Sequence, residues 1–156
     1  MYDNVKAQHQ LVTAHLKIQH LHAVVGWSMG AGQTFQWGAA YPGFIDYIVP
    51  FCGAARTAEH NKTFLYSLIN TIKLDKAWDS PSEDATEGKK AFASIYSAWG
   101  FSQAFYRQKL YQQLGFETLD DFLKRFWEPL FGQKDARNLV HMLNTWISGD
   151  IVSACF

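Results

Sequence analysis

Hydrophobic and polar residues over the first fifty positions follow the order helix, strand, helix, strand. Residues 3–17 carry aliphatic side chains among lysines, glutamines and histidines, which predicts an amphipathic helix with Asp3 as its N-cap. Residues 20–25 form a short run rich in β-branched side chains, typical of a strand buried in a parallel sheet. A second helix is expected over residues 31–41 and a second strand over residues 44–49. Strand, helix and strand at this spacing predict a parallel βαβ unit.

The pattern changes after the second strand. No strand pattern occurs between residue 54 and about residue 149, and a polar stretch at residues 79–88 predicts a solvated loop. The expected helices cover residues 60–75, 89–113, 118–131 and 135–147, and the last three are rich in aromatic residues. We therefore predict the α/β class: a piece of parallel sheet followed by a helical block of roughly 95 residues.

The candidate chemistry lies between the first strand and the helix that follows it. Gly26-Trp27-Ser28-Met29-Gly30 matches Gly-x-Ser-x-Gly, the nucleophile-elbow motif, in the strand-to-helix context that this motif requires. We predict Ser28 as a nucleophile, with the backbone N–H of Met29 donating to the oxyanion. Side chains at Gly26 and Gly30 are expected to clash with neighbouring backbone. The alternative is a tight turn whose glycines serve packing alone, and the glycine spacing does not fit a phosphate-binding loop.

The sequence offers no recognisable base or acid for this serine. His60 and His141 are the two histidines that follow Ser28, and both fall in helical patterns that favour surface or packing roles. None of the candidate acids ends an apolar strand; they are Asp46, Asp75, Asp79, Asp84, Asp120, Asp121, Asp135 and Asp150. We therefore expect the chain to be an internal portion of a larger enzyme, with the acid and the histidine outside it. The second hypothesis is a catalytically incomplete fragment or a non-catalytic remnant.

Composition narrows the functional classes further. Fourteen Lys and Arg residues balance fourteen Asp and Glu residues among 156, which argues against binding nucleic acid by charge. No apolar run approaches the roughly 18 residues of a membrane span, and no charged-then-apolar leader follows Met1. Cys52 and Cys155 have apolar neighbours and no metal-ligand spacing, so we expect buried free thiols and a cytoplasmic location.

Beyond the bare motif, the stretch from Val24 to Gln33, followed by Trp37 and Tyr41-Pro42, resembles the elbow region of the homoserine O-acetyltransferases. A later stretch is similar to the end of that family's helical lid; it comprises residues 119–123, Phe131, residues 135–138 and residues 150–152. The resemblance implies the α/β-hydrolase fold, with the lid inserted after the strand that follows the elbow helix. It divides the chain into a partial core with the elbow (1–58), a lid (59–150) and an incomplete return to the core (151–156).

The resemblance also implies an activity and its partners. Members transfer an acetyl group through an acyl-serine, and relatives in the superfamily hydrolyse esters. The roles of nucleophile and oxyanion donor fall on Ser28 and Met29. No cofactor is implied beyond acetyl-CoA or another acyl-CoA as co-substrate. A small ester or thioester substrate and a homodimer are expected, with no nucleic-acid or membrane partner.

Because the sequence departs from the family pattern, it does not decide between a hydrolase and an acyltransferase. Trp27, Ala31 and Gly32 stand where the acetyltransferases usually have Gly, Gly and Met. The stretch at residues 99–102 lacks the family's lid arginine, which is linked to the amino-acid carboxylate, and Arg107 lies further on. Several aromatic side chains of the lid could instead line an apolar acyl-binding pocket, although such side chains more often belong to the hydrophobic core. They are Trp99, Phe101, Phe105, Phe126 and Trp127.

Overall fold

The structure is a computed structural model, and it describes residues 1–80 and 83–151. The chain divides into two compact units. The first unit comprises Met1–Lys62 and the chain from Asn144 onward, and the second unit comprises Thr63–Leu143. Each unit is described by itself.

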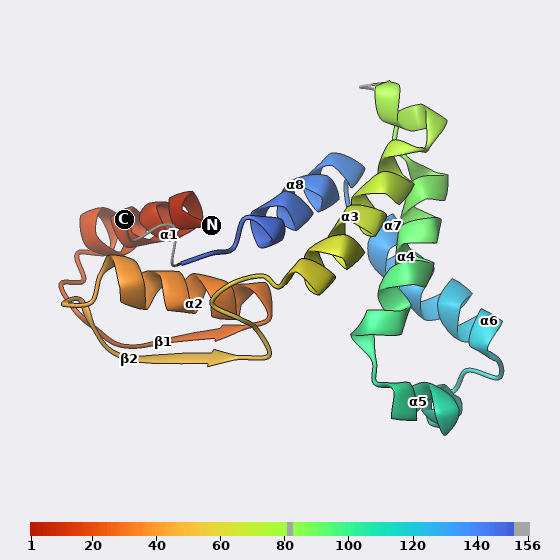
Figure 1. Cartoon of the computed structure of the whole chain (residues 1–156), viewed down its shortest axis with the longest axis horizontal. Coiled ribbons are helices and arrows are strands. Elements are labelled where there is room, and N and C mark those ends of the chain that lie inside the picture. The colour runs from red at the N-terminus through yellow and green to blue at the C-terminus, as the bar shows by residue number, and fades with distance from the viewer. Residues whose placement is uncertain (81–82, 152–156) are drawn as a thin grey trace. The chain divides into compact units, whose positions relative to one another are not determined.

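The first unit is built around the predicted βαβ motif (Figure 1). Its elements, in chain order, are α1 (Tyr2–Gln10), a π-helical turn (Leu11–His15), β1 (Leu21–Trp27), α2 (Met29–Ala40) and β2 (Ile45–Phe51). The two strands are parallel, in a register that runs from Leu21 opposite Ile45 to Trp27 opposite Phe51. Helix α2 packs on both strands, and α1 packs on α2. The parallel βαβ unit is therefore confirmed.

Three local expectations in this unit are wrong. The first helix is regular only to Gln10, and its N-cap is Met1 instead of Asp3, which lies in the first turn. The second strand continues through Pro50 to Phe51. Proline has no backbone N–H to donate, but the described residues pair β2 with β1 alone, and a strand at a sheet edge accommodates a proline.

The strands are also less buried than their apolar sequence predicts. Side chains alternate between the two faces of the sheet, and the face turned away from α2 carries exposed Val25, Trp27, Tyr47 and Val49. Val25 is 63% exposed and Trp27 is 66% exposed. The reason is that, within the described part of the chain, α2 covers only the opposite face.

A small core joins α1 to the βαβ motif. Val5, Trp37 and Ile45 are buried together, one from each of α1, α2 and β2. The indole Nε1 of Trp37 donates a hydrogen bond of 2.8 Å to Oε1 of Gln8. This bond satisfies the one polar atom of a buried indole, so it fixes the orientation of α1 on α2.

A cluster of two histidines and one aspartate links the amino ends of the two strands. His20 Nε2 donates to Asp46 Oδ1 at 2.8 Å, and His22 Nδ1 donates to Asp46 Oδ2 at 3.0 Å. These hydrogen bonds stabilise the carboxylate and hold the pKa of Asp46 below its ordinary value. Ser28 follows the opposite, carboxyl end of β1, so this cluster is separate from the candidate site.

The second unit is helical, as predicted, but its helices are shorter than the sequence pattern suggests. The elements are the greater part of α3 (Glu59–Lys73), a 3-10 turn (Lys76–Asp79), α4 (Thr86–Gly100), α5 (Gln103–Arg107), a second 3-10 turn (Leu110–Leu114), α6 (Leu119–Phe122), a π-helical turn (Leu123–Trp127), α7 (Glu128–Gly132) and most of α8 (Ala136–Ile147). Among the helices in the described ranges, none combines the length and apolar character that crossing a membrane requires.

The single helix expected over residues 89–113 is instead divided into three elements, the 15-residue α4 and the two five-residue elements α5 and Leu110–Leu114. It begins earlier, at Thr86, and breaks after Gly100. A Cβ at Gly100 would lie 2.2 Å from the ring of Trp127, so the absence of a side chain allows that indole to pack closely. Ser102 then begins α5, because its hydroxyl accepts a hydrogen bond from the N–H of Phe105 at 3.2 Å.

The aromatic residues of this unit form its core. The buried cluster consists of Ala93, Phe105, Tyr111, Phe122 and Trp127. Phe101 stacks on Phe105 with ring centroids 4.1 Å apart. Of the rings suggested for an acyl pocket, Phe105 and Trp127 therefore lie in the core of the unit. Trp99 is about half exposed and stacks on Phe64.

Lys89 is a buried cation that holds two parts of the second unit together. Its side chain is 3% exposed. The Nζ donates to the carbonyl oxygens of Gly132 at 2.8 Å and Lys134 at 3.0 Å, and it also pairs with the carboxylate of Asp84. The ammonium thus uses all three of its N–H groups, which is the condition for burying such a charge.

We expect Lys89→Met to lower the free energy of unfolding by about 2–3 kcal/mol, because it leaves two carbonyls and a carboxylate without their donor. Urea denaturation followed by circular dichroism measures this loss. Lys90→Met is the matched control, since Lys90 is exposed and pairs with Glu87 at the surface; its effect should stay within about 0.5 kcal/mol. Equal losses in the two variants would contradict a role for the buried network.

Candidate functional site

Ser28 occupies the turn between β1 and α2. Its backbone has φ 57° and ψ −123°, a positive-φ conformation that is strained for a residue with a side chain. The N–H of Ser28 donates to the carbonyl of Phe51 at 3.1 Å, and its carbonyl accepts from the N–H of Ala31 at 2.9 Å. The side chain makes no capping hydrogen bond to α2. The two backbone bonds hold the strained turn, and the hydroxyl is left available.

Two glycines allow this turn to be tight. A Cβ at Gly26 would lie 2.1 Å from the carbonyl oxygen of Gly30 and 2.3 Å from Oγ1 of Thr34. A Cβ at Gly53 would lie 2.5 Å from the carbonyl oxygen of Ser28. The motif predicted the requirement at Gly26 but not the one at Gly53, because the Gly53 contact joins positions 25 residues apart.

The expected steric requirement at Gly30 is not found. A Cβ at this position would meet no described atom within 4 Å. Gly30 lies in the first turn of α2, and its carbonyl oxygen is the atom that a Cβ at Gly26 would meet. No described residue fills the space beside the Cα of Gly30 itself. Within this part of the chain, Gly26 rather than Gly30 is the glycine that close packing demands.

Met29 is the first residue of α2. The first N–H groups of an α-helix have no acceptor within the helix, and they carry the positive end of the helix dipole. A negatively charged oxygen next to Ser28 would therefore be stabilised at this end of α2. The role predicted for the Met29 N–H is compatible with this position.

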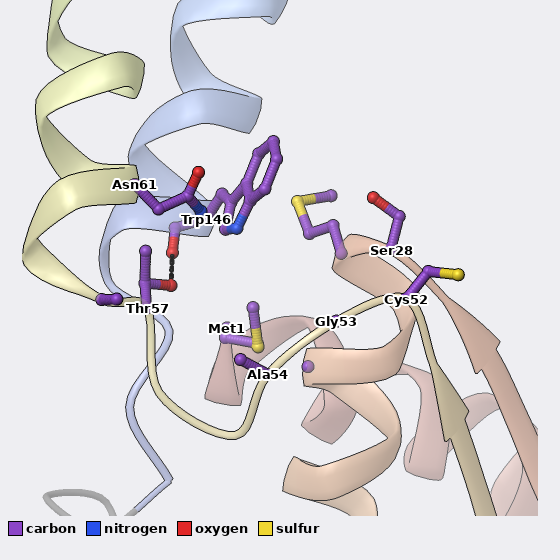
Figure 2. Close-up of a pocket in the computed structure, with 11 residues that line it drawn as sticks. Met1, Ser28, Cys52, Gly53, Ala54, Thr57, Asn61 and Trp146 are labelled. Carbon is purple, nitrogen blue, oxygen red and sulfur yellow. Dashed lines mark hydrogen bonds between the residues drawn. The ribbon is translucent and has the colours of Figure 1, made fainter. Parts of the chain in front are cut away.

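Ser28 faces a pocket of about 200 Å³ within the first unit (Figure 2). The lining residues are Met1, Ser28, Met29, Gly32, Cys52, Gly53, Ala54, Thr57, Ala58, Asn61 and Trp146. Ser28 and Cys52 lie on one side, at the carboxyl ends of the strands, and Asn61 and Trp146 lie on the other. Most of the wall is apolar, so polar groups on a bound molecule would meet few partners.

Contacts between distant parts of the sequence assemble the far wall of this pocket. The N–H of Thr57 donates to the carbonyl of Gly149 at 2.8 Å, and its hydroxyl donates to the carbonyl of Trp146 at 2.7 Å. Next to them, Arg56 and Asp150 form an antiparallel bridge, with Nε and Oδ2 separated by 3.2 Å. These contacts bring Trp146, from the end of α8, beside the start of α3.

Cys52 is exposed, which corrects the expectation of a buried thiol. It has φ 53° and follows the last residue of β2, so its side chain lies at the open end of the sheet beside Ser28. Burial was inferred from its apolar neighbours in sequence, but Val49 and Phe51 are themselves about half exposed. Cys155 lies outside the described residues.

No histidine or carboxylate is among the described residues that line the pocket. His60, in the first turn of α3, and His141, on α8, are both exposed. Several of the candidate acids have structural partners instead: Asp46 binds two histidines, Asp75 caps the 3-10 turn, Asp84 pairs with Lys89, Asp121 pairs with Arg125, Asp135 accepts from the N–H of Asn138, and Asp150 pairs with Arg56. The described pocket thus contains a serine at a strained turn, an apolar wall and no side chain that could act as its base.

Comparison with known proteins gives a consistent set of relatives, although no protein-family model matches the chain. The chain is 35% identical over 153 residues to an ethyl acetate hydrolase of Pseudomonas veronii, an alignment that covers 96% of this chain and 44% of the relative. It is 29% identical over 102 residues to a homoserine O-acetyltransferase of Corynebacterium urealyticum, which covers 65% of this chain and 24% of the relative. The chain therefore spans less than half the length of these relatives.

The solved structure of an acetyl esterase is similar to nearly all of the chain. The TM-score is 0.95 at 34% identity, and the match covers 98% of this chain and 46% of that chain. Segments similar to the βαβ motif and to the helices that follow it therefore occur in one larger solved enzyme.

Proposed function

The chain belongs to the α/β-hydrolase-fold enzymes that include the esterases and homoserine O-acetyltransferases, and we propose that the protein transfers acyl groups through a covalent intermediate on Ser28. The observation that carries the proposal is the conformation of Ser28. Its hydroxyl has no capping bond, sits at a strained turn before a helix N-terminus and faces a largely apolar pocket.

The reaction proceeds in two steps at this serine. The Oγ of Ser28 attacks the carbonyl carbon of an ester or thioester while its proton passes to a general base. The resulting oxyanion lies at the amino end of α2, where the Met29 N–H donates to it. The alcohol or thiol then leaves with a proton, and the acyl group remains on Ser28. Water or an alcohol then attacks the acyl-serine and releases the serine.

Hydrolysis of small esters is the favoured form of this reaction. The ethyl acetate hydrolase is similar over 96% of the chain, whereas the homoserine O-acetyltransferase is similar over 65%. The pocket of about 200 Å³ that the described residues enclose can hold a short group. Acyl transfer from acetyl-CoA to an alcohol acceptor would use the same serine and would require water to be kept from the acyl-enzyme.

Covalent labelling tests the proposal directly. We expect a fluorophosphonate probe to add one label to the full-length protein, and peptide mapping to place that label on Ser28. Cys52→Ala is the control, because the thiol of Cys52 lies beside Ser28 in the pocket and its removal should leave the label in place. A label on any other residue, or no label on a folded sample, would contradict the proposal and support the alternative of a non-catalytic remnant.

A further inference from the structure

Asn61 places an amide in the pocket opposite Ser28. It lies in the first turn of α3 and is part of the pocket lining. In Figure 2, Asn61 and Trp146 lie on one side of the pocket, and Ser28 and Cys52 lie on the other. When Ser28 attacks the carbonyl carbon of a substrate, a group on that substrate that extends across the pocket would therefore approach Asn61.

The amide of Asn61 has unused hydrogen-bonding capacity. It makes no hydrogen bond with any residue in the described parts of the chain, although an amide offers two donors and an acceptor. By contrast, the hydroxyl of Thr57 in the same wall is committed to the carbonyl of Trp146 at 2.7 Å. The neighbouring lining residues Met1, Ala54 and Ala58 offer only apolar side chains.

A polar group in an otherwise apolar pocket provides selectivity. A few convergent polar groups orient a ligand, and a substrate that lacks the matching atom leaves them unpaired. A hydroxyl can accept from the amide nitrogen and donate to the amide oxygen, so it would use the capacity of Asn61 in both directions. A plain alkyl group of the same size would displace water from the amide without replacing its hydrogen bonds.

We propose that Asn61 is a specificity-determining residue, and that the preferred substrate is a small ester or thioester that carries a hydroxyl on the group seated in the Ser28 pocket. The proposal rests on the proposed acyl transfer at Ser28 and names the substrate class of that site. Asn61 hydrogen-bonds this hydroxyl, while Ser28 reacts with the carbonyl carbon.

Pairs of substrates of equal size test this assignment with the full-length protein. One pair differs in the alcohol part, 2-hydroxyethyl acetate against propyl acetate. The other pair differs in the acyl part, ethyl glycolate against ethyl propionate. The measured quantity is the ratio of kcat/KM for the hydroxyl ester to kcat/KM for the alkyl ester. Comparing this ratio between variants cancels the intrinsic reactivity of the esters.

We expect Asn61→Leu to lower this ratio roughly 5- to 20-fold for one of the two pairs, in line with the loss of a hydrogen bond in a desolvated site. Asn61→Ala should lower the same ratio without adding bulk, which covers the case in which the leucine variant folds poorly. Asn70→Leu is the matched control, since Asn70 lies on the same helix, is exposed and is not part of the pocket. Its ratio should equal that of the wild type.

A ratio within twofold of the wild type in both Asn61 variants, for both pairs, would overturn the assignment of Asn61. Turnover that survives Ser28→Ala would overturn the proposed function instead. The two failures are distinguishable, because the first leaves hydrolysis dependent on Ser28.

Discussion

Ser28→Ala is expected to lower kcat/KM for a short acetyl ester by at least about 1,000-fold, because removing a nucleophile leaves only the contribution of binding and the oxyanion donor. The substitution removes one oxygen that makes no capping bond to α2. The folded structure should therefore be preserved, and the loss should come from kcat. Steady-state hydrolysis of ethyl acetate by the full-length protein, together with its thermal unfolding, measures both quantities.

Ser148→Ala provides the matched control for this loss. Ser148 is an exposed serine in the same unit, and its hydroxyl donates to the carbonyl of Thr145 at the end of α8. The same chemical change at that position should leave kcat/KM within about twofold, as expected for a surface substitution away from the chemistry. A Ser28→Ala protein that keeps more than a tenth of the wild-type activity would show that another group performs the reaction.

Gly26→Ala is expected to disturb both the stability and the reactive turn. The added methyl group would lie 2.1 Å from the Gly30 carbonyl oxygen and 2.3 Å from Thr34 Oγ1, so β1 and the start of α2 must separate. Overpacking of this kind costs about 1–3 kcal/mol in the free energy of unfolding. Because Ser28 lies between the two displaced segments, its rate of labelling by a fluorophosphonate should fall as well.

Gly43→Ala separates this contact from the general effect of replacing a glycine. A Cβ at Gly43 would meet no described atom within 4 Å, and its φ is not in the left-handed region. Chemical denaturation and labelling rates of the two variants should therefore differ, with Gly43→Ala close to the wild type. Gly26→Ala with wild-type stability and labelling would show that the turn relaxes more easily than its contacts indicate.

Short-range features of the fold were predictable because local chemistry dominates them. The strand before Gly26, the helix after Ser28 and the second strand are each marked by residue types within a few positions. The helices of the second unit have regular apolar spacing, and the structure contains helices over these stretches, with shifted ends and with a break after Gly100. The break after Gly100 was not predictable, since it depends on how Trp127, 27 residues later, packs on that glycine.

The sequence by itself determined the parallel βαβ unit, the position of Ser28 in the turn and the helical character of the second unit, because each follows from neighbouring residues. Only the tertiary structure decided which glycines the turn requires, that Cys52 is exposed and that Asn61 and Trp146 share a pocket with Ser28. The physical reason is that these properties are contacts between segments far apart along the chain. The hydrogen bonds of Thr57 to Trp146 and Gly149 join positions about 90 residues apart, and no local pattern encodes such a contact.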